Sequence, residues 1–527
     1  MEADRGNWNT LWSQVARIVR PETDYFNRIA VAPGEKRTEY QFDSTAASAS
    51  ERCSAALESE IAPRTQRWHS LSSDDPQYNE DPLWKRWFEQ VTDVVFAARY
   101  SPFANFSGQF SRSCQSLVDF GTQALFIDEV VGRNLRYKSI HLSELYIAES
   151  FTGIVDKVHR KFELTTRQAV QQFGEDALPD GMKSVIEREP ERKWQFVHCV
   201  KPNDENDPDA KRKPFVSYYI AVEGKKIVLA GGYFSMPYAV SRWASSDKEV
   251  FGRGPAIKAL ADMRMLNEQE KTILRAGHRA VDPPLLMQED GALQAFSMRP
   301  NALNYGGVDA NGRATVLPLQ TGANLPLGLE MSDKKRQSIN DAFYVTLFQV
   351  LVQNPQMTAT EAMLRAQEKG ALLAPMMGSQ QSEWLGPLIA RELDILSRAG
   401  QLPPPPAKIS DISVKIEYTS PLVRAQRSGE GVAIMNTLNA VLPFAQIDQK
   451  VLKRFNFDAV AKGLADINGM PATMLYTDDE MANIDAEQAS AEQAQAAVNA
   501  APALSQSVLN LAKANQAASA PAPIQGA

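Results

Sequence analysis

The chain has 527 residues, of which 44% are hydrophobic, and this is enough to fill the cores of three or four domains of roughly 150 residues each. A formal net charge of −7 excludes a protein that is held on nucleic acid by wholesale neutralisation of phosphates. Three scattered cysteines, Cys53, Cys114 and Cys199, exclude a disulfide framework and indicate a reducing compartment.

The first 120 residues predict a group of helices. Apolar residues recur at helical spacing from Trp8 to Val19, and Pro21 ends the run. A second helix is expected to begin after Asp43 or Ser44 and to end before Pro63, and two more cover Leu83–Tyr100 and Asn105–Phe120. Large aromatic residues accompany these helices and are expected in the core or at a subunit interface: Trp68, Trp84 and Trp87.

From Ala124 the apolar period changes to two, which predicts strands. The expected strands cover 125–128, 135–137, 153–158, 196–201, 215–222 and 225–230, the last two joined around Glu223 and Gly224. Helices followed by antiparallel strands indicate an α+β region. The segment 202–213, acidic and then basic, is expected to be an exposed loop.

A long helix is predicted between Gly254 and Asp282, where Pro255 suits a first helical position and Pro283 stops the helix. About 26 residues would form a rod of roughly 40 Å. Its middle, Asn267–Thr272, has no apolar residue on any face, so this helix cannot lie wholly inside the core of one chain. A second helix, Ser332–Val352, follows a segment rich in Gly, Asn and Pro, and the pattern predicts two rods holding a compact tip.

The remaining chain is predicted to be largely helical. The second rod must stop at Pro355, and Thr358 with Glu361 is a candidate capping box for the next helix. That helix should be kinked or split near Pro375 and Gly386–Pro387 and should end at Gly400. A proline linker, a strand at 414–418 and helices through 467 follow, and the Ala- and Gln-rich end beyond 485 is expected to be loose.

No catalytic, metal or cofactor site is expected. The sequence has no phosphate-binding loop, and its five histidines are never spaced as metal ligands. Gly252 and Gly254 are interpreted as a tight entry into the long helix, because a lone Gly-x-Gly is a weak phosphate signal. No apolar run approaches the ~20 residues of a membrane span, and no export signal follows Met1.

Eight sequence blocks stand out along the chain: Pro237–Trp243, Phe251–Ala256, Leu266–Glu268, Lys271–Ala276, Ala280–Leu285, Thr358–Glu361, Arg391–Gly400 and Ser420–Arg427. Together they resemble the portal (head-to-tail connector) proteins of short-tailed, podovirus-like bacteriophages. They occur in that family's order and cover most of the chain up to about residue 470.

The resemblance implies a multi-domain α+β subunit with a wing, a two-helix stem, a small clip and a helical crown. The implied boundaries are 1–250 for the wing, 251–284 and 331–353 for the stem helices, 285–330 for the clip, 354–425 for a channel loop and long wing helix, and 426–527 for the crown. It also implies a ring, usually a dodecamer, at one capsid vertex, through which double-stranded DNA is packaged and ejected. The implied partners are terminase, then the tail adaptor, with scaffolding and major capsid proteins; the chain would be made in the host cytoplasm and end in the virion.

Two groups of residues are candidates for this function. Lys271, Arg275 and Arg279 form a basic stripe at helical spacing, which either bridges subunits or faces passing DNA. With them, the loop residues Asn354, Gln356 and Met357 are expected to face the channel. The clip candidates for partner docking are Gln288, Arg299, Asn301, Asn304, Tyr305, Asn311 and Arg313. The alternatives are another phage structural protein, such as a core or scaffolding component, or a phage hydrolase.

Overall fold

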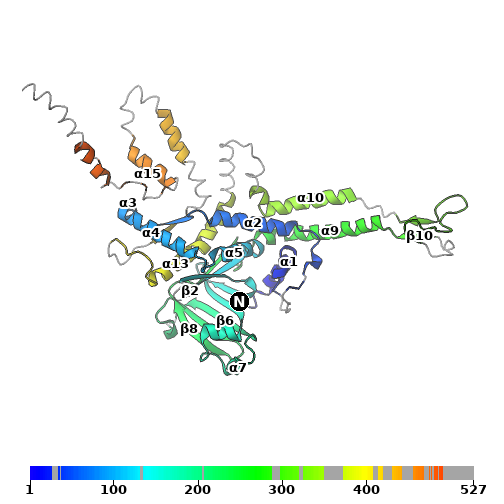
Figure 1. Ribbon diagram of the computed structural model, residues 1–527, viewed down its shortest axis with the longest axis horizontal. Helices are drawn as coiled ribbons and strands as arrows, with labels where there is room; N and C mark the ends of the chain where they lie inside the picture. Colours follow the sequence, from blue (N-terminus) through cyan, green and yellow to red (C-terminus); the bar gives the residue numbers. More distant parts are fainter. Residues whose placement is uncertain are drawn as a thin grey trace, which may run out of the picture. The chain divides into compact units, whose positions relative to one another are not determined.

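The computed structural model describes residues 1–26, 34–35, 37–130, 134–204, 207–287, 297–319, 325–348, 372–406, 414–418, 430–441, 455–467, 470, 474, 476, 480–484 and 486–490 (Figure 1). The chain forms two compact units. The larger comprises Met1–Ser72, Gln90–Pro404 and Val414–Gly429, and the smaller comprises Ser73–Glu89, Pro405–Ser413 and Glu430–Ala527.

The expected helices of the first 120 residues are confirmed. They are α1 (Gly6–Val19), α2 (Thr45–Ile61), α4 (Pro82–Arg99) and α5 (Phe106–Phe120), with the short helices η1 (Pro21–Thr23), η2 (Thr38–Tyr40) and α3 (Pro76–Glu80) between them. In the larger unit, Trp12 of α1 is fully buried and donates its indole N–H to the carbonyl of Phe120, at 3.1 Å. Trp68 and Trp84 are buried, as expected of core residues.

The predicted strands are also confirmed, and they form two antiparallel sheets. The order β3-β2-β9 makes a three-stranded sheet, and β4-β5-β6-β7-β8 makes a five-stranded one. The strands are β2 (Thr122–Val130), β3 (Asn134–Ser139), β4 (Leu145–Glu149), β5 (Val155–Thr165), β6 (Lys193–Pro202), β7 (Phe215–Ala221), β8 (Lys226–Tyr233) and β9 (Tyr238–Arg242), with η3 (Leu142–Glu144) and η4 (Pro208–Ala210) beside them. Sequence periodicity missed β4 and β9, which are only five residues long.

Helices α6 (Thr166–Phe173) and α7 (Asp180–Lys183) close a core on one face of the five-stranded sheet. Phe196 of β6 and Tyr219 of β7 point into this core, where they meet Ala169 and Met182. Thr165 begins α6 with a capping box, in which its hydroxyl accepts from the backbone N–H of Gln168 and the side-chain oxygen of Gln168 accepts from the backbone N–H of Thr165. The two sheets and their helices therefore form the strand-rich body of the larger unit.

Gly252 and Gly254 allow the chain to pass very close to the end of α5. A Cβ atom added at Gly252 would lie 2.4 Å from the carbonyl oxygen of Gly121, and one at Gly254 would lie 2.7 Å from that of Val118. Gly121 itself has a φ of +74°, a left-handed conformation that favours glycine. The interpretation of Gly252 and Gly254 as a tight entry to the long helix is therefore confirmed.

In the described ranges 372–406 and 414–418, the predicted helix end before Gly400 and the strand at 414–418 are confirmed, whereas the helix continues through Pro375. A helix at 372–380 passes through a π-helical turn, η5 (Gln381–Leu385), into α13 (Gly386–Arg398). Pro387 lies in the first turn of α13, directly after the π-helical turn, so the helix is irregular but not split where a proline cannot donate to the helical ladder. The strand β12 (Val414–Tyr418) pairs with β1 (His69–Ser73). The capping box at Thr358 and Glu361 lies outside the described residues.

The described parts of the smaller unit are mostly helical. They include the start of α4, a helix at 430–441, and α15 (Phe457–Ile467). Nη2 of Arg86 donates to both carboxylate oxygens of Glu480, each at 3.1 Å. This pair joins an early helix of the chain to its late segment within this unit.

Candidate functional site

Two antiparallel helices of the larger unit form a long hairpin, which Figure 1 shows with β10 beyond their ends. The first rod is α8 (Pro255–Lys258) followed directly by α9 (Leu260–Val281), so the predicted helix is confirmed, including its end before Pro283. The second rod is α10 (Leu325–Ala342), which is followed by a turn at Tyr344 with a φ of +58°. The prediction of one helix over Ser332–Val352 was therefore wrong at its start and in its continuity.

The early start of α10 has a local cause. Pro326 is tolerated in the first helical turn because its missing N–H would have no helical partner there. Gly328 faces α9, where an added Cβ would lie 3.2 Å from the Cγ1 atom of Ile273. In the sequence, Pro326 and Gly328 assigned this stretch to the tip. In the structure, Pro326 lies in the first turn of α10, and Gly328 lets α10 approach α9.

Ion pairs fasten the hairpin together and to the body. Lys335 of α10 bonds Asp262 of α9 at 2.8 Å. Arg336 bonds Glu270 of α9 at 2.7 Å and Asp43, just before α2, at 3.0 Å. The guanidinium of Arg336 therefore joins three helices at one place.

The polar middle of α9 is partly satisfied within the chain. The side chain of Asn267 accepts from the backbone N–H of Phe42 at 2.8 Å and donates to the carbonyl of Tyr40 at 2.7 Å. Glu270 is used by Arg336. The prediction that α9 cannot lie wholly inside one chain's core still holds, because only Leu260, Met263 and Leu266 of this helix are buried.

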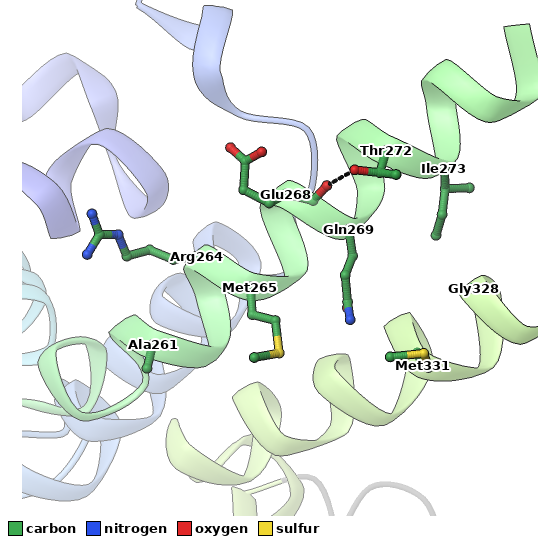
Figure 2. A pocket seen from close by; sticks show the side chains of 9 residues that line it. All are labelled: Ala261, Arg264, Met265, Glu268, Gln269, Thr272, Ile273, Gly328 and Met331. Atoms are coloured by element: carbon green, nitrogen blue, oxygen red, sulfur yellow. Dashed lines mark hydrogen bonds between the residues drawn. The ribbon is translucent and has the colours of Figure 1, made fainter.

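An open groove of about 730 Å³ runs along α9 beside α10 (Figure 2). Its apolar lining includes Met265 and Met331, which are 50% and 48% exposed, together with Ile273. Gln269 also lines it, and the side-chain oxygen of this residue is buried without a hydrogen-bond partner among the described residues. Sequence reasoning missed this groove, although Ala261, Met265, Gln269 and Thr272 recur at helical spacing.

The structure places the predicted basic stripe on α9. Arg275 and Arg279 are exposed and form no ion pair with the part of the chain that is described. Lys271 is less exposed: its ammonium lies 3.4 Å from Glu268 and 5.6 Å from the ring centre of Phe42. The three residues therefore lie together on one helix, and what they face beyond it stays a prediction.

The tip of the hairpin contains a two-stranded ribbon, β10 (Leu285–Met287) with β11 (Val316–Pro318). Most candidate docking residues that the structure describes are exposed there: Arg299, Asn301, Tyr305, Asn311 and Arg313. Asn304 differs, because its amide both accepts from and donates to the backbone of Ser297, at 2.8 and 2.9 Å. Its role in the tip is structural. Gln288 and the channel candidates Asn354, Gln356 and Met357 lie outside the described residues.

The buried polar groups of the body are engaged in structural contacts. Arg99 and Glu392 form a fully buried ion pair, which Tyr137 joins by donating to Glu392 at 2.5 Å. His198 lies between the two sheets, with Tyr238 at 2.6 Å and Ser217 at 3.0 Å, and burial lowers the pKa of its imidazole to about 3. Burial also raises the pKa of the Cys114 thiol well above its usual range. None of these groups opens onto the groove.

Across the described ranges, no three His, Cys, Asp or Glu side chains gather closely enough to hold a metal ion. Nor does any described helix combine the length and apolar character needed to cross a bilayer.

Known proteins supply the wider context. A family model described as bacteriophage head to tail connecting protein matches residues 1–475. The chain is 27% identical over 506 residues to the probable portal protein of Bordetella phage BPP-1, covering 94% of this chain and 90% of the relative. It is likewise 27% identical over 513 residues to the portal protein of Salmonella phage epsilon15, with the same 94% and 90% coverage.

Solved structures give weaker likenesses. The neck of an empty gene transfer agent particle aligns with a TM-score of 0.35 at 9% identity, over 72% of this chain and 84% of that one. A chain of the native gene transfer agent virion aligns with a TM-score of 0.31 at 11% identity, over 74% and 89%. At these TM-scores the likeness adds nothing to the fold described above. Because the family model runs from residue 1 to residue 475, this protein belongs to the bacteriophage head to tail connecting proteins.

Proposed function

We propose that this chain is a phage portal protein, which forms the passage between capsid and tail. The observation that carries the proposal is the family match over residues 1–475, together with two portal proteins that align with 94% of the chain. The family is structural rather than catalytic, so the function depends on the shape of the assembled protein and on the surfaces that bind other virion proteins. A hydrolase and a core or scaffolding component are disfavoured for the same reason.

The finer proposal is a ring, of twelve copies as is usual for portals, at one vertex of the virion. Double-stranded DNA passes through the ring during packaging and ejection. A closed ring needs two different complementary sides on each subunit. The hairpin supports this arrangement, because α9 is mostly exposed and carries an open apolar groove beside its cationic residues. The acidic chain, with net charge −7, would hold passing DNA weakly.

The assignment of parts follows the same proposal. The body before residue 250 is the wing, α8–α9 and α10 are the stem, the segment between them is the clip, and the residues beyond 426 form the crown. The clip docks terminase and then the tail adaptor, and the body meets scaffolding and major capsid proteins during assembly in the host cytoplasm. Lys271, Arg275, Arg279, Asn354, Gln356 and Met357 remain the candidates for the channel.

Replacing residues 288–324 by a short linker tests this function. The change keeps α9 and α10 whole, so we expect rings to form at nearly normal yield. Terminase and tail adaptor should no longer bind, because the exposed side chains of the tip are gone. Pull-down of each partner and the DNA content of assembled particles are the measurements.

A point variant with a matched control sharpens the experiment. Tyr305→Ala removes an aromatic side chain of the tip that is 79% exposed. If the phenol ring of Tyr305 anchors the interface, this change should weaken the binding of terminase and tail adaptor at least tenfold. Phe151→Ala removes a fully exposed aromatic from the hairpin between β4 and β5 and should leave docking unchanged. Normal packaging and tail attachment by the shortened protein would refute the clip assignment.

A further inference from the structure

The outer edge of α9, away from α10, carries a regular row of charges. Arg264, Glu268, Lys271 and Arg275 are spaced by four, three and four residues, which places them on one side of the helix. Figure 2 shows Met265 and Gln269 pointing toward α10 and Arg264 and Glu268 on the other side of α9, although Arg264 and Glu268 also contribute to the lining of the groove. Three of the four charges in this row are positive.

The outer edge of α10 carries a row of residues with the same spacing, but most of the charges in this row are negative. Glu330, Lys334, Gln337 and Asp341 follow one another by four, three and four residues and are all exposed. A different side of α10 faces α9, since Gly328 approaches Ile273 and Lys335 bonds Asp262. Two of the three charges in this row are negative.

Contacts inside the hairpin fix the relative level of the two rows. Gly328 lies beside Ile273, and the helices run in opposite directions with the same rise per residue. Lys271 lies two residues before Ile273 on α9, and Glu330 lies two residues after Gly328 on α10. Because the helices are antiparallel, Lys271 and Glu330 are at the same level, that is, at the same position along the hairpin axis. Further along, Glu268 is within one residue of the level of Lys334, and Arg264 is level with Gln337.

We propose that the stem edge of α9 in one copy binds the stem edge of α10 in the next copy of this chain. The proposal rests on the ring of the proposed function. Rotation about an axis that runs along the hairpin keeps every residue at its level. Lys271 then meets Glu330 of the next copy, and Glu268 meets Lys334 of the next copy. Opposite charges face each other in both places, as a head-to-tail closed contact requires.

The present partners of these charges can be exchanged at little cost. Lys271 lies 3.4 Å from Glu268, and Lys334 lies 2.8 Å from Glu330, each pair within one helix. The carboxylates of Glu268 and Glu330 are 68% and 64% exposed, so these local pairs are weak. In the assembled ring each of these charges still has a partner of opposite sign, but the partner now lies on a helix of the neighbouring copy. Of the two alternatives given for the basic stripe, this contact favours the bridging of subunits for Lys271.

Disulfide trapping tests the proposal. The double variant Lys271→Cys with Glu330→Cys, in a Cys199→Ser background, should give a ladder of covalent oligomers on non-reducing gels after mild oxidation. Within one copy the two positions lie on opposite outer edges of the hairpin, too far apart for a disulfide. The matched control Lys271→Cys with Asp341→Cys is displaced by about three helical turns and should stay monomeric. An equal mixture of the single variants Lys271→Cys and Glu330→Cys should give covalent dimers and nothing larger, because each copy then carries only one of the two cysteines.

Each outcome decides the proposal. Rings in electron micrographs without a Lys271–Glu330 ladder would overturn this interface and leave the portal function standing, whereas absence of rings in the unaltered protein would remove the portal function itself. A second test uses charge: Glu330→Lys should lower ring yield several-fold at low salt, and Lys271→Glu added to it should restore the yield. Equal ring yields for all three proteins would also overturn the interface.

Discussion

Replacing Glu392 by glutamine should destabilise the larger unit by about 3–5 kcal/mol, the usual cost of breaking one partner of a buried ion pair. Both side chains of the Arg99–Glu392 pair are fully buried. Arg99 bonds Glu392 through Nε at 2.9 Å and through Nη2 at 2.5 Å. Glutamine keeps the volume but leaves the guanidinium charge of Arg99 without a counterion in the core.

The measurement is equilibrium denaturation at fixed protein concentration, because association also contributes to stability. Trp68 is a local reporter, since its ring lies 4.5 Å from the guanidinium carbon of Arg99. The control Glu191→Gln breaks an ion pair with Arg167 whose side chains are 55% and 67% exposed, and it should cost no more than about 1 kcal/mol. If the two variants lose similar stability, the buried pair is not a major support of the fold.

Acid should weaken the fold through its buried histidines. Burial lowers the pKa of His198 to about 3, and burial beside Arg99 lowers the pKa of His69 well below its usual value. Both imidazoles stay neutral in the folded chain while the unfolded chain takes up protons below pH ~6.5. The free energy of unfolding should therefore fall as the pH drops, by up to roughly 1.4 kcal/mol per pH unit for each histidine.

A histidine variant isolates this effect. His198→Gln keeps a neutral polar group between Tyr238 and Ser217, and it should reduce the pH dependence between pH 7 and pH 5 by about 2 kcal/mol in total. Gln171→Ala alters an exposed, uncharged residue of α6 and serves as the control, with an unchanged slope. Identical slopes for all three proteins would show that His198 is not held neutral by the fold.

Much of the secondary structure was predictable because it depends on local patterns. Helices α1, α4 and α9 have clear periodicity with proline at or near one end, α5 has clear periodicity without it, and buried positions alternate along β6 from Lys193 to Val200. The start of α10 was missed because Pro326 and Gly328 are read locally as helix breakers. Only the approach of Gly328 to Ile273 in the folded hairpin shows why they are tolerated.

The tertiary uses of polar residues were not predictable. Arg99 and Glu392 are 293 positions apart, and nothing in either neighbourhood marks them as a buried pair. Asn267 and Glu270 made the middle of α9 look unsatisfied, yet they bind the backbone at Tyr40 and Phe42 and the side chain of Arg336. What does remain open on the hairpin is the groove of Met265 and Met331, and finding it required both helices together.

The proposed function requires that copies of this chain close into a ring with a passage through it. Negative-stain electron microscopy of the purified full chain should show end-on views of closed rings with a central hole. Light scattering on the same sample should give a mass on the order of 700 kDa if twelve copies of 58.3 kDa assemble. Particles without a central hole, or a monomer at every protein and salt concentration, would contradict it.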